Sequence, residues 1–341
     1  MNKEKFFDLQ KDGMVCCRLC PHSCNIKNGH FGICRVRGNK DREAILPYYG
    51  LITAMAFDPI EKKPLYHFRP GSIIFSIGFF GCNLRCPFCQ NWHISQDSSM
   101  AERSAVQLQP SDIVSAAIQK NSLAIAYTYS EPLVHAEFLL DCMLLARKNG
   151  IANVLVTNGF INKDVAEEIL NLTDAANIDL KCFSEKIYSK ILGGAMNGKT
   201  LETVLDFIRI SHSKGVHTEV TTLIVPGLND NDSELDSCAE FIGSMDLPWH
   251  LSAYHPDYKY NAPPTDPLYL ESIKNRYNKK TKYIYTGNIF AEENDTLCSY
   301  CNAILVRRIS YKTDIIGLIP PIEKGKYYRC KTCSNETKIV F

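Results

Sequence analysis

Apolar, strand-like runs alternate with helix-like segments along most of this 341-residue chain, and this alternation constrains its fold more than any other feature. Strands are expected at residues 123–128, 152–157, 175–180, 216–225, 249–254 and 283–286. Helices are expected at residues 111–119, 133–148, 163–171, 200–214, 233–245 and 267–277. Repeated strand–helix units predict an α/β fold with a parallel sheet. Their number favours a partial (β/α)6-type TIM-like barrel, with a doubly wound open sheet as the rival architecture.

Three regions are expected along the chain: a Cys-rich N-terminal lobe and connector at residues 1–71, the barrel at residues 72–290, and a zinc-ribbon-like lobe at residues 291–341. Residues 1–12 predict a short polar helix or arm. In the connector, closely spaced prolines predict hairpin or edge structure rather than a helix. Its Lys62, Lys63 and His67 can face an active site, but a solvated hairpin face is the favoured interpretation.

Three cysteines, Cys82, Cys86 and Cys89, follow an apolar run at residues 73–80 with the spacing C-x3-C-x2-C. Thiolate is the usual protein ligand of iron–sulfur clusters. Three cysteines leave one iron of a [4Fe-4S] cluster open to a small molecule, which can then receive an electron. The alternative is a Cys3His zinc site completed by His93. Because a zinc knuckle needs neither this spacing nor a preceding buried strand, the sequence favours the cluster.

Two further groups of four cysteines lie near the chain ends. The first has the spacing C-x2-C-x3-C-x9-C and comprises Cys17, Cys20, Cys24 and Cys34. It can close a four-thiolate site for zinc or for a second [4Fe-4S] cluster, and spacing alone does not decide between them. The second has a zinc-ribbon spacing, which favours zinc over iron–sulfur, and comprises Cys298, Cys301, Cys330 and Cys333.

Four cysteines remain outside these groups. Cys142, Cys182 and Cys238 are expected to be buried as small apolar side chains. Cys16 can exchange with Cys17 as a ligand. Fifteen cysteines in one chain favour metal binding in a reducing compartment over disulfides.

The overall charge gives no electrostatic case for a nucleic-acid or membrane partner, since the formal net charge is +1 and 22% of residues are charged. The sequence lacks a signal-peptide core and a run of membrane-spanning length, so a cytoplasmic protein is expected. The C-terminal end is nonetheless locally basic, through Arg307, Arg308, Lys324, Lys326, Arg329 and Lys331. A bound RNA or protein substrate is therefore a hypothesis for that end.

Polar residues gather at the predicted strand ends, which lie at one edge of a parallel sheet. Glu131 follows the strand at 123–128 and can either cap the next helix or bind a cationic amine. Asp179 and Lys181 alternate along their strand and therefore share one face, where they can form an ion pair. The others at strand ends are Asn158, the Thr218–Thr222 stretch, His255 and Asn288. Of these, His255 and Asn288 can either touch substrate or pack as ordinary loop residues.

Several of these segments resemble the branch of radical S-adenosylmethionine (SAM) enzymes around the glycyl-radical-enzyme activases. They are residues 82–89, with Phe88 before the third cysteine, and residues 130–132, 157–159 and 177–181. The resemblance implies that SAM occupies the open iron and that its reduction yields a 5′-deoxyadenosyl radical. It implies a reductant such as ferredoxin or flavodoxin. The residues that would hold SAM are Phe88, Glu131, Asn158, Asp179 and Lys181, although Tyr129-Ser130 replaces the two glycines that precede the glutamate in that group.

A second resemblance covers nearly the whole chain, to the radical SAM enzyme of the AmmeMemoRadiSam system. The matching segments are residues 20–24, 58–65, His250, 253–258 and 285–288, together with the C-terminal cysteine pairs. It implies association with a Memo-like protein and an AMMECR-type protein, and it leaves the substrate open. Three hypotheses follow: a radical SAM enzyme that abstracts hydrogen from an unidentified substrate, a glycyl-radical activase, and a non-enzymatic zinc-binding scaffold.

Overall fold

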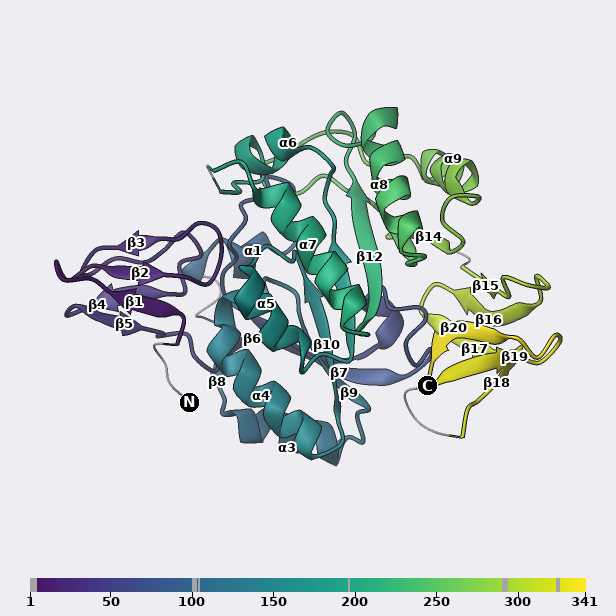
Figure 1. Ribbon diagram of the computed structural model, residues 1–341, viewed down its shortest axis with the longest axis horizontal. Helices are drawn as coiled ribbons and strands as arrows, with labels where there is room; N and C mark the ends of the chain where they lie inside the picture. Colours follow the sequence, from purple (N-terminus) through teal and green to yellow (C-terminus); the bar gives the residue numbers. More distant parts are fainter. Residues whose placement is uncertain (1–4, 100–102, 104, 196, 290–293, 323–325) are drawn as a thin grey trace.

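The computed structural model describes residues 5–99, 103, 105–195, 197–289, 294–322 and 326–341. A central sheet with its helices lies between two small β-rich lobes, the N-terminal lobe at one end and the C-terminal lobe at the other (Figure 1). Within these described ranges, no helix is both long and apolar enough to cross a membrane.

The central sheet has nine strands in the order β14-β13-β12-β11-β10-β9-β7-β6-β8. Its parallel strands are β7 (Ile73–Phe79), β9 (Ala124–Thr128), β10 (Ala152–Thr157), β11 (Ala175–Asp179), β12 (His217–Ile224), β13 (Trp249–Ala253) and β14 (Ile284–Gly287). The antiparallel strands β6 (Leu51–Pro59) and β8 (Val106–Gln107) form one edge. The predicted parallel sheet is confirmed. The doubly wound alternative is wrong, because the parallel strands follow chain order without reversal; the (β/α)6 barrel type stays a prediction.

Helices connect the parallel strands and cover the sheet (Figure 1). They are α1 (Trp92–Ser95), α3 (Pro110–Gln119), α4 (Ala136–Lys148), α5 (Lys163–Leu170), α6 (Glu185–Lys190), α7 (Thr200–Ser213), α8 (Asp232–Ser244) and α9 (Pro267–Tyr277), with 3-10 turns at Ile60–Lys62 and Pro132–His135. Each helix expected in the strand–helix units is present, while α1 and α6 were not expected. The start of α3 is typical: Gln109 and Asp112 form a capping box around Pro110, which supplies a fixed φ at the first turn.

The segment between β6 and β7, which we call the floor segment (residues 60–72), is held to the sheet by one buried carboxylate. Glu219 on β12 accepts hydrogen bonds from the backbone N–H groups of Tyr66 (3.1 Å) and His67 (2.8 Å). The favoured solvated hairpin face is therefore wrong for His67 and for Lys63, both of which are buried. Lys63 Nζ lies 3.2 Å from a carboxylate oxygen of Asp58, and this ion pair offsets the cost of burying the charges.

The N-terminal lobe is built from short antiparallel strands. They are β1 (Phe7–Leu9), β2 (Val15–Cys17), β3 (Asn25–Ile26), β4 (Gly38–Lys40) and β5 (Glu43–Ile45). The helix or arm expected over residues 1–12 is thus wrong in its described part, because Phe6 and Phe7 are buried and fix β1 against β2. A buried ion pair joins the lobe to α4, where Arg37 donates to both oxygens of Glu137 at 2.6 and 2.7 Å.

The C-terminal lobe contains two three-stranded sheets. One holds β15 (Thr296–Leu297), β16 (Ile304–Ile309) and β17 (Lys312–Ile315), and the other holds β18 (Leu318–Ile319), β19 (Tyr327–Cys330) and β20 (Glu336–Val340). The lobe packs on the floor segment: Val340 N donates to His67 O at 2.7 Å, and Arg308 donates to Tyr66 O at 2.5 Å. The expected boundary at residues 71 and 72 falls between β6 and β7, which pair with each other; the division into regions stays a prediction.

Candidate functional site

The three-cysteine loop directly follows strand β7 at the edge of the sheet. The last residues of β7 are fully buried, and the chain then turns at Gly81, whose φ of +89° is one that other residues rarely adopt. Polar groups approach the sulfurs: Leu84 N donates to Cys82 Sγ at 3.3 Å, and Ser95 Oγ on α1 lies 3.3 Å from Cys89 Sγ. Hydrogen bonds of this kind stabilise thiolates and tune a bound cluster.

The spacing of these thiols does not suit a single ion. A tetrahedral zinc with Zn–S bonds of ~2.3 Å separates its sulfurs by about 3.8 Å. In the described part of the chain, no three of Cys82, Cys86, Cys89 and His93 bring their ligand atoms within 4.8 Å of one another. The Cys3His zinc alternative is therefore not formed. A [4Fe-4S] cluster places its thiolates on separate irons and needs the wider spacing, so these residues fit that group.

A cavity of about 210 Å³ opens beside the cysteines, at the carboxyl ends of the parallel strands. Besides the three cysteines, its walls include the residues expected at the cofactor: Phe88, Glu131, Asn158, Asp179 and Lys181. The structure thus brings into one cavity a set of side chains that are widely separated in sequence. The parallel sheet does this, since strand ends from β7 to β12 meet at one edge.

Glu131 is a buried carboxylate in the cavity wall. It caps the 3-10 turn by accepting from Leu133 N at 3.0 Å, and it accepts from Thr157 Oγ1 at 2.6 Å and from Asn158 N at 2.8 Å. Both interpretations of Glu131 therefore have a structural basis. Burial raises its pKa to about 7, and no ion pair to Glu131 forms among the described residues. Since a carboxylate has about four acceptor positions, room for one more donor remains.

Asp179 and Lys181 lie at the end of β11 and form the expected ion pair, with Nζ 2.9 Å from a carboxylate oxygen. Burial disfavours the charged lysine, but the carboxylate of Asp179 more than offsets this, so the pKa of Lys181 is raised. The cavity wall therefore contains both the cation of Lys181 and the buried Glu131. Asn158 links this wall to the cysteine loop by donating to Asn83 Oδ1 at 3.0 Å.

His255 and Asn288 are exposed and do not belong to the cavity wall. His255 Nε2 lies 2.8 Å from Asn288 O, and Asn288 Nδ2 donates to Ala253 O at 2.8 Å. These bonds match the loop-packing interpretation, and a substrate contact for either residue stays a prediction.

The cavity wall also contains residues that the sequence reasoning missed. Leu223 of β12 and Ser252 of β13 lie on the cavity side of the sheet, beside Thr221 of the expected Thr218–Thr222 stretch. Strand alternation from Thr221 would have indicated Leu223. Tyr129 also lines the cavity and donates its hydroxyl to Asp58 at 2.8 Å. Its φ of +68°, unusual for a bulky residue, cannot be read from local sequence.

Comparisons with known proteins show the family to which the chain belongs. The Radical SAM superfamily profile matches residues 76–242. The pyruvate formate-lyase 1-activating enzyme of Escherichia coli K12 is 30% identical over 197 residues, which cover 54% of this chain and 77% of that protein. The chain belongs to the radical SAM superfamily. An uncharacterized protein of Methanocaldococcus jannaschii, MJ0808, is 38% identical over the full length of both chains.

Among solved structures, a domain of a pyruvate-formate lyase-activating enzyme from Bacteroides vulgatus is similar, with a TM-score of 0.42 and 20% identity. The matched region covers 48% of this chain and 99% of the solved domain. Radical SAM proteins are enzymes, and the family implies a [4Fe-4S] cluster and SAM.

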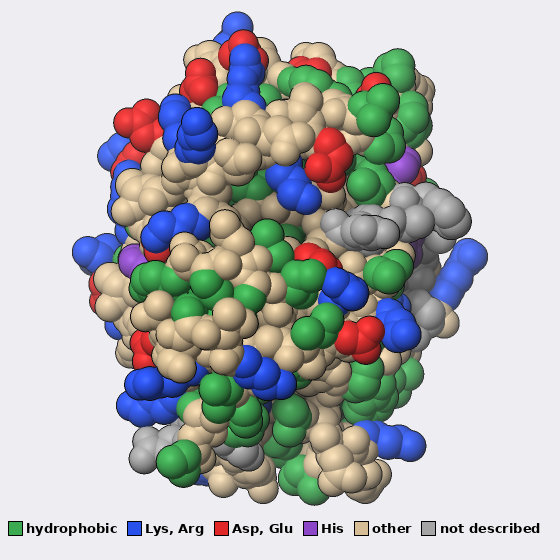
Figure 2. Space-filling view, turned by 90° about the vertical axis from the view of Figure 1, so that its right-hand side faces the viewer, with side chains coloured by type: hydrophobic (Ala, Val, Ile, Leu, Met, Phe, Trp, Pro, Cys, Tyr) green, Lys and Arg blue, Asp and Glu red, His purple; other side chains and the backbone are tan. Residues whose placement is uncertain are grey.

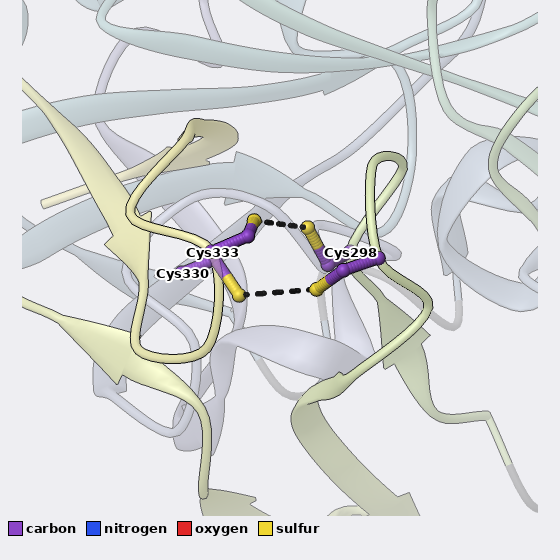
Figure 3. Close-up of side chains that lie close together, drawn as sticks. Cys298, Cys330 and Cys333 are labelled. Carbon is purple, nitrogen blue, oxygen red and sulfur yellow. Dashed lines mark hydrogen bonds between the residues drawn. The ribbon is translucent and has the colours of Figure 1, made fainter.

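The C-terminal cysteines of this radical SAM chain form a compact group. Cys298 Sγ lies 3.7 Å from Cys333 Sγ, and Cys301 Sγ lies 3.7 Å from Cys330 Sγ. All four sulfurs are within 4.8 Å of one another. Figure 3 shows the labelled cysteines facing one another from two loops. These distances match the sulfur edges of one tetrahedral ion, at about 3.8 Å.

The N-terminal cysteines Cys17, Cys20, Cys24 and Cys34 surround a small closed cavity in their lobe. Cys17 lines this cavity, whereas Cys16 does not, so the predicted exchange between them is not needed. The remaining cysteines Cys142, Cys182 and Cys238 are buried, which confirms the expectation for them.

The basic C-terminal end is only partly exposed. Arg307, Lys326, Arg329 and Lys331 face solvent, but Arg308 is fully buried, so the expectation of a basic surface is wrong for it. Lys324 lies outside the described residues. On the face that carries this lobe, Lys and Arg side chains are dispersed among hydrophobic ones (Figure 2).

Proposed function

We propose that this radical SAM chain cleaves SAM reductively at a [4Fe-4S] cluster held by Cys82, Cys86 and Cys89, and that the 5′-deoxyadenosyl radical abstracts hydrogen from an unidentified substrate. The observation that carries the proposal is the environment of Glu131. Glu131 is a fully buried carboxylate, it lines the same cavity as the three cysteines, and it has no cationic partner in the described ranges. Its hydrogen bonds offset only part of the cost of burying this carboxylate, since burial still raises its pKa to about 7, and a cationic ligand would lower that cost.

In this proposal, different side chains of the cavity wall bind different parts of SAM. Glu131 accepts the methionyl amine, and Lys181 offers a cation for the carboxylate. Asp179, which is partly exposed, can accept ribose hydroxyls. Asn158 is fixed by its hydrogen bond to Asn83, and this bond joins the cavity wall to the cysteine loop. Phe88 is buried and gives the cavity an apolar side.

The test is anaerobic reconstitution with iron and sulfide, followed by SAM and dithionite, with 5′-deoxyadenosine measured by mass spectrometry. Wild-type protein should form 5′-deoxyadenosine, and Cys86→Ala should form none. Glu131→Gln keeps the shape of the side chain but removes its charge, so it should bind SAM at least tenfold more weakly while retaining the cluster. A cluster-loaded wild type that yields no 5′-deoxyadenosine would overturn the proposal.

A glycyl-radical activase is the second candidate. The Escherichia coli relative, 30% identical, is named pyruvate formate-lyase 1-activating enzyme, and a protein of Methanocaldococcus jannaschii, 23% identical, is named a putative glycyl-radical enzyme activating enzyme. This candidate predicts a glycine-centred electron paramagnetic resonance (EPR) signal when the cognate enzyme is supplied. The Escherichia coli relative matches 54% of this chain, which leaves nearly half of the chain outside the comparison. A zinc-binding scaffold, the non-enzymatic candidate, predicts about three zincs and no iron in anaerobically purified protein.

We assign zinc to the C-terminal cysteines, because their sulfur separations match one tetrahedral ion.

We further propose that the chain belongs to the AmmeMemoRadiSam system, acts in the cytoplasm and associates with a Memo-like and an AMMECR-type protein. The support is the motif at residues 58–65, whose Asp58 and Lys63 both contact Tyr129 of the cavity wall. Co-elution with the two purified proteins on size exclusion is the test, and separate elution would count against it. The hypothesis of an RNA or protein substrate is tested by size exclusion with candidate RNA or protein added, where co-elution with the chain is the expected result.

A further inference from the structure

The N-terminal cysteine group has the dimensions of a polynuclear site. Among the described residues, no three of its four sulfurs lie within 4.8 Å of one another, although all four line one cavity. The C-terminal group of the same chain, at 3.7 Å, shows the spacing of a single ion. The three sulfurs of the cluster loop, which lie within the described residues, likewise do not all lie within 4.8 Å of one another. Two of the three cysteine groups therefore have room for a cluster, and one does not.

N–H donors are directed at each of the four N-terminal sulfurs. Arg37 Nε donates to Cys17 Sγ at 3.2 Å, and Ile33 N donates to Cys24 Sγ at 3.5 Å. The backbone N–H group of His22 donates to the sulfur of Cys20. The backbone N–H groups of Val36 and Arg37 donate to the sulfur of Cys34. Donors around sulfur stabilise thiolate ligands and set the potential of an iron–sulfur cluster. The cavity wall also includes the apolar side chains of Leu19, Ile26 and Val134, beside His22 and Arg37.

This cysteine group directly adjoins the loop that carries the first cluster. The carbonyl oxygen of Cys34 lies so close to Gly81 that a Cβ there would be 2.7 Å from it. His22 Nε2 lies 2.8 Å from Asn83 O. Arg35 donates to Ser95 O at 3.0 Å, and Ser95 in turn approaches Cys89 Sγ. The residues beside Cys34 and those beside Cys82 are thus in van der Waals contact, with no other segment between them.

We propose that Cys17, Cys20, Cys24 and Cys34 bind a second [4Fe-4S] cluster, which passes electrons from an external protein reductant of the ferredoxin or flavodoxin class to the cluster at Cys82, Cys86 and Cys89. One electron leaves the reductant, reduces the N-terminal cluster, and then reduces the loop cluster while the N-terminal cluster is reoxidised. No covalent bond forms or breaks in this transfer. The lobe lies at the periphery of the molecule (Figure 1), where a protein reductant can reach it. The relay, unlike the second cluster itself, rests on the proposed radical SAM function.

The presence of the second cluster is tested without SAM activity. A Cys82→Ala/Cys86→Ala/Cys89→Ala variant cannot bind the loop cluster. Anaerobically purified, it should retain about four irons and four sulfides per chain, against about eight of each in the wild type. Four irons in the wild type and none in this variant, with an added zinc, would overturn the proposal. This readout stands even if no 5′-deoxyadenosine is ever formed.

The relay is tested with a Cys20→Ser/Cys24→Ser variant, and Cys16→Ser serves as the matched control because its sulfur lies outside the cavity. With reduced flavodoxin, 5′-deoxyadenosine formation should fall at least tenfold in the double variant and stay within twofold in the control. With dithionite, a small reductant that reaches the loop cluster directly, the double variant should stay within threefold of wild type. Equal rates with flavodoxin in all three proteins would overturn the relay. Equal losses with both reductants would also overturn it, because they would indicate a structural role.

Discussion

Glu219 provides the sharpest test of how the floor of the sheet is held. It is fully buried, and each of its carboxylate oxygens accepts two N–H groups. One oxygen accepts from His67 N and from His217 Nε2 at 2.8 and 2.9 Å, and the other from Tyr66 N and His250 Nε2 at 3.1 and 2.7 Å. Burial alone would raise the pKa of Glu219, but its bonds to the two histidines dominate and lower it. The carboxylate is therefore charged at neutral pH.

Substitution Glu219→Gln preserves the shape of the side chain and replaces one acceptor oxygen with an NH2 donor. Whichever way the amide is turned, this donor faces one backbone N–H and one imidazole. The imidazole can change its tautomer, but the peptide N–H cannot, so one buried donor is left unpaired at a cost of about 1–3 kcal/mol. The lost charge-assisted bond adds about 1.5–3 kcal/mol. We expect the free energy of unfolding to fall by about 3–5 kcal/mol.

Urea unfolding at pH 7 measures this change through the fluorescence of Trp249, which is buried beside His250 on β13. The control is Glu240→Gln, the same chemical change at an exposed position of α8, which should shift the free energy by less than about 0.5 kcal/mol. A lowered carboxylate pKa stabilises the fold above the unfolded value and loses that contribution as pH falls through the folded value. The difference between wild type and Glu219→Gln should therefore shrink below about pH 4. A change under 1 kcal/mol at pH 7 would refute the reasoning.

Three further changes test other parts of the molecule. Burial lowers the pKa of His67 to about 3 and of His135 to about 4, so the unfolded chain binds more protons below pH 6.5. The free energy of unfolding should fall by about 2 kcal/mol per histidine from pH 7 to pH 5, and a flat pH series would contradict this. Gly81→Ala places a Cβ 2.7 Å from a backbone oxygen of the N-terminal lobe, so it should loosen that lobe to limited proteolysis. Gly29→Ala, with a similar φ but open space, is its control, and equal cleavage would count against the contact. Cys330→Ser should remove one zinc per chain by elemental analysis, and an unchanged zinc content would argue against the C-terminal site.

Much of the cavity was predictable because its residues follow buried strands. The apolar runs before Glu131 and Asn158 and around Asp179 identified the strands, and parallel strands necessarily bring their carboxyl ends to one edge. The ion pair of Asp179 with Lys181 followed from strand alternation alone. The local sequence pattern was sufficient to predict these positions, because the position of each residue depends on the strand to which it belongs.

Long-range packing was not predictable in the same way. Lys63 lies in a charged, proline-rich segment that is typical of a solvated hairpin, yet it is buried beside Asp58. Tyr129 reaches the same carboxylate only because its backbone adopts a positive φ. Arg308 belongs to a basic stretch but turns inward onto Tyr66. In each case a partner distant in sequence decides the side chain's place, and a single sequence does not show that partner.

These distant partners bear on what the radical SAM site acts upon. The family profile covers residues 76–242, but Tyr129 in the cavity wall is held by Asp58 and Lys63, which precede that range. The floor segment that follows them is in turn fixed by Glu219 and by the C-terminal lobe. The cysteine loop contacts the N-terminal lobe through His22. The residues within the family profile can therefore supply SAM chemistry, while residues outside the profile help to shape the cavity and join it to both lobes. We infer that substrate selection depends on these flanking parts, and that a core cut to the family range would lose it.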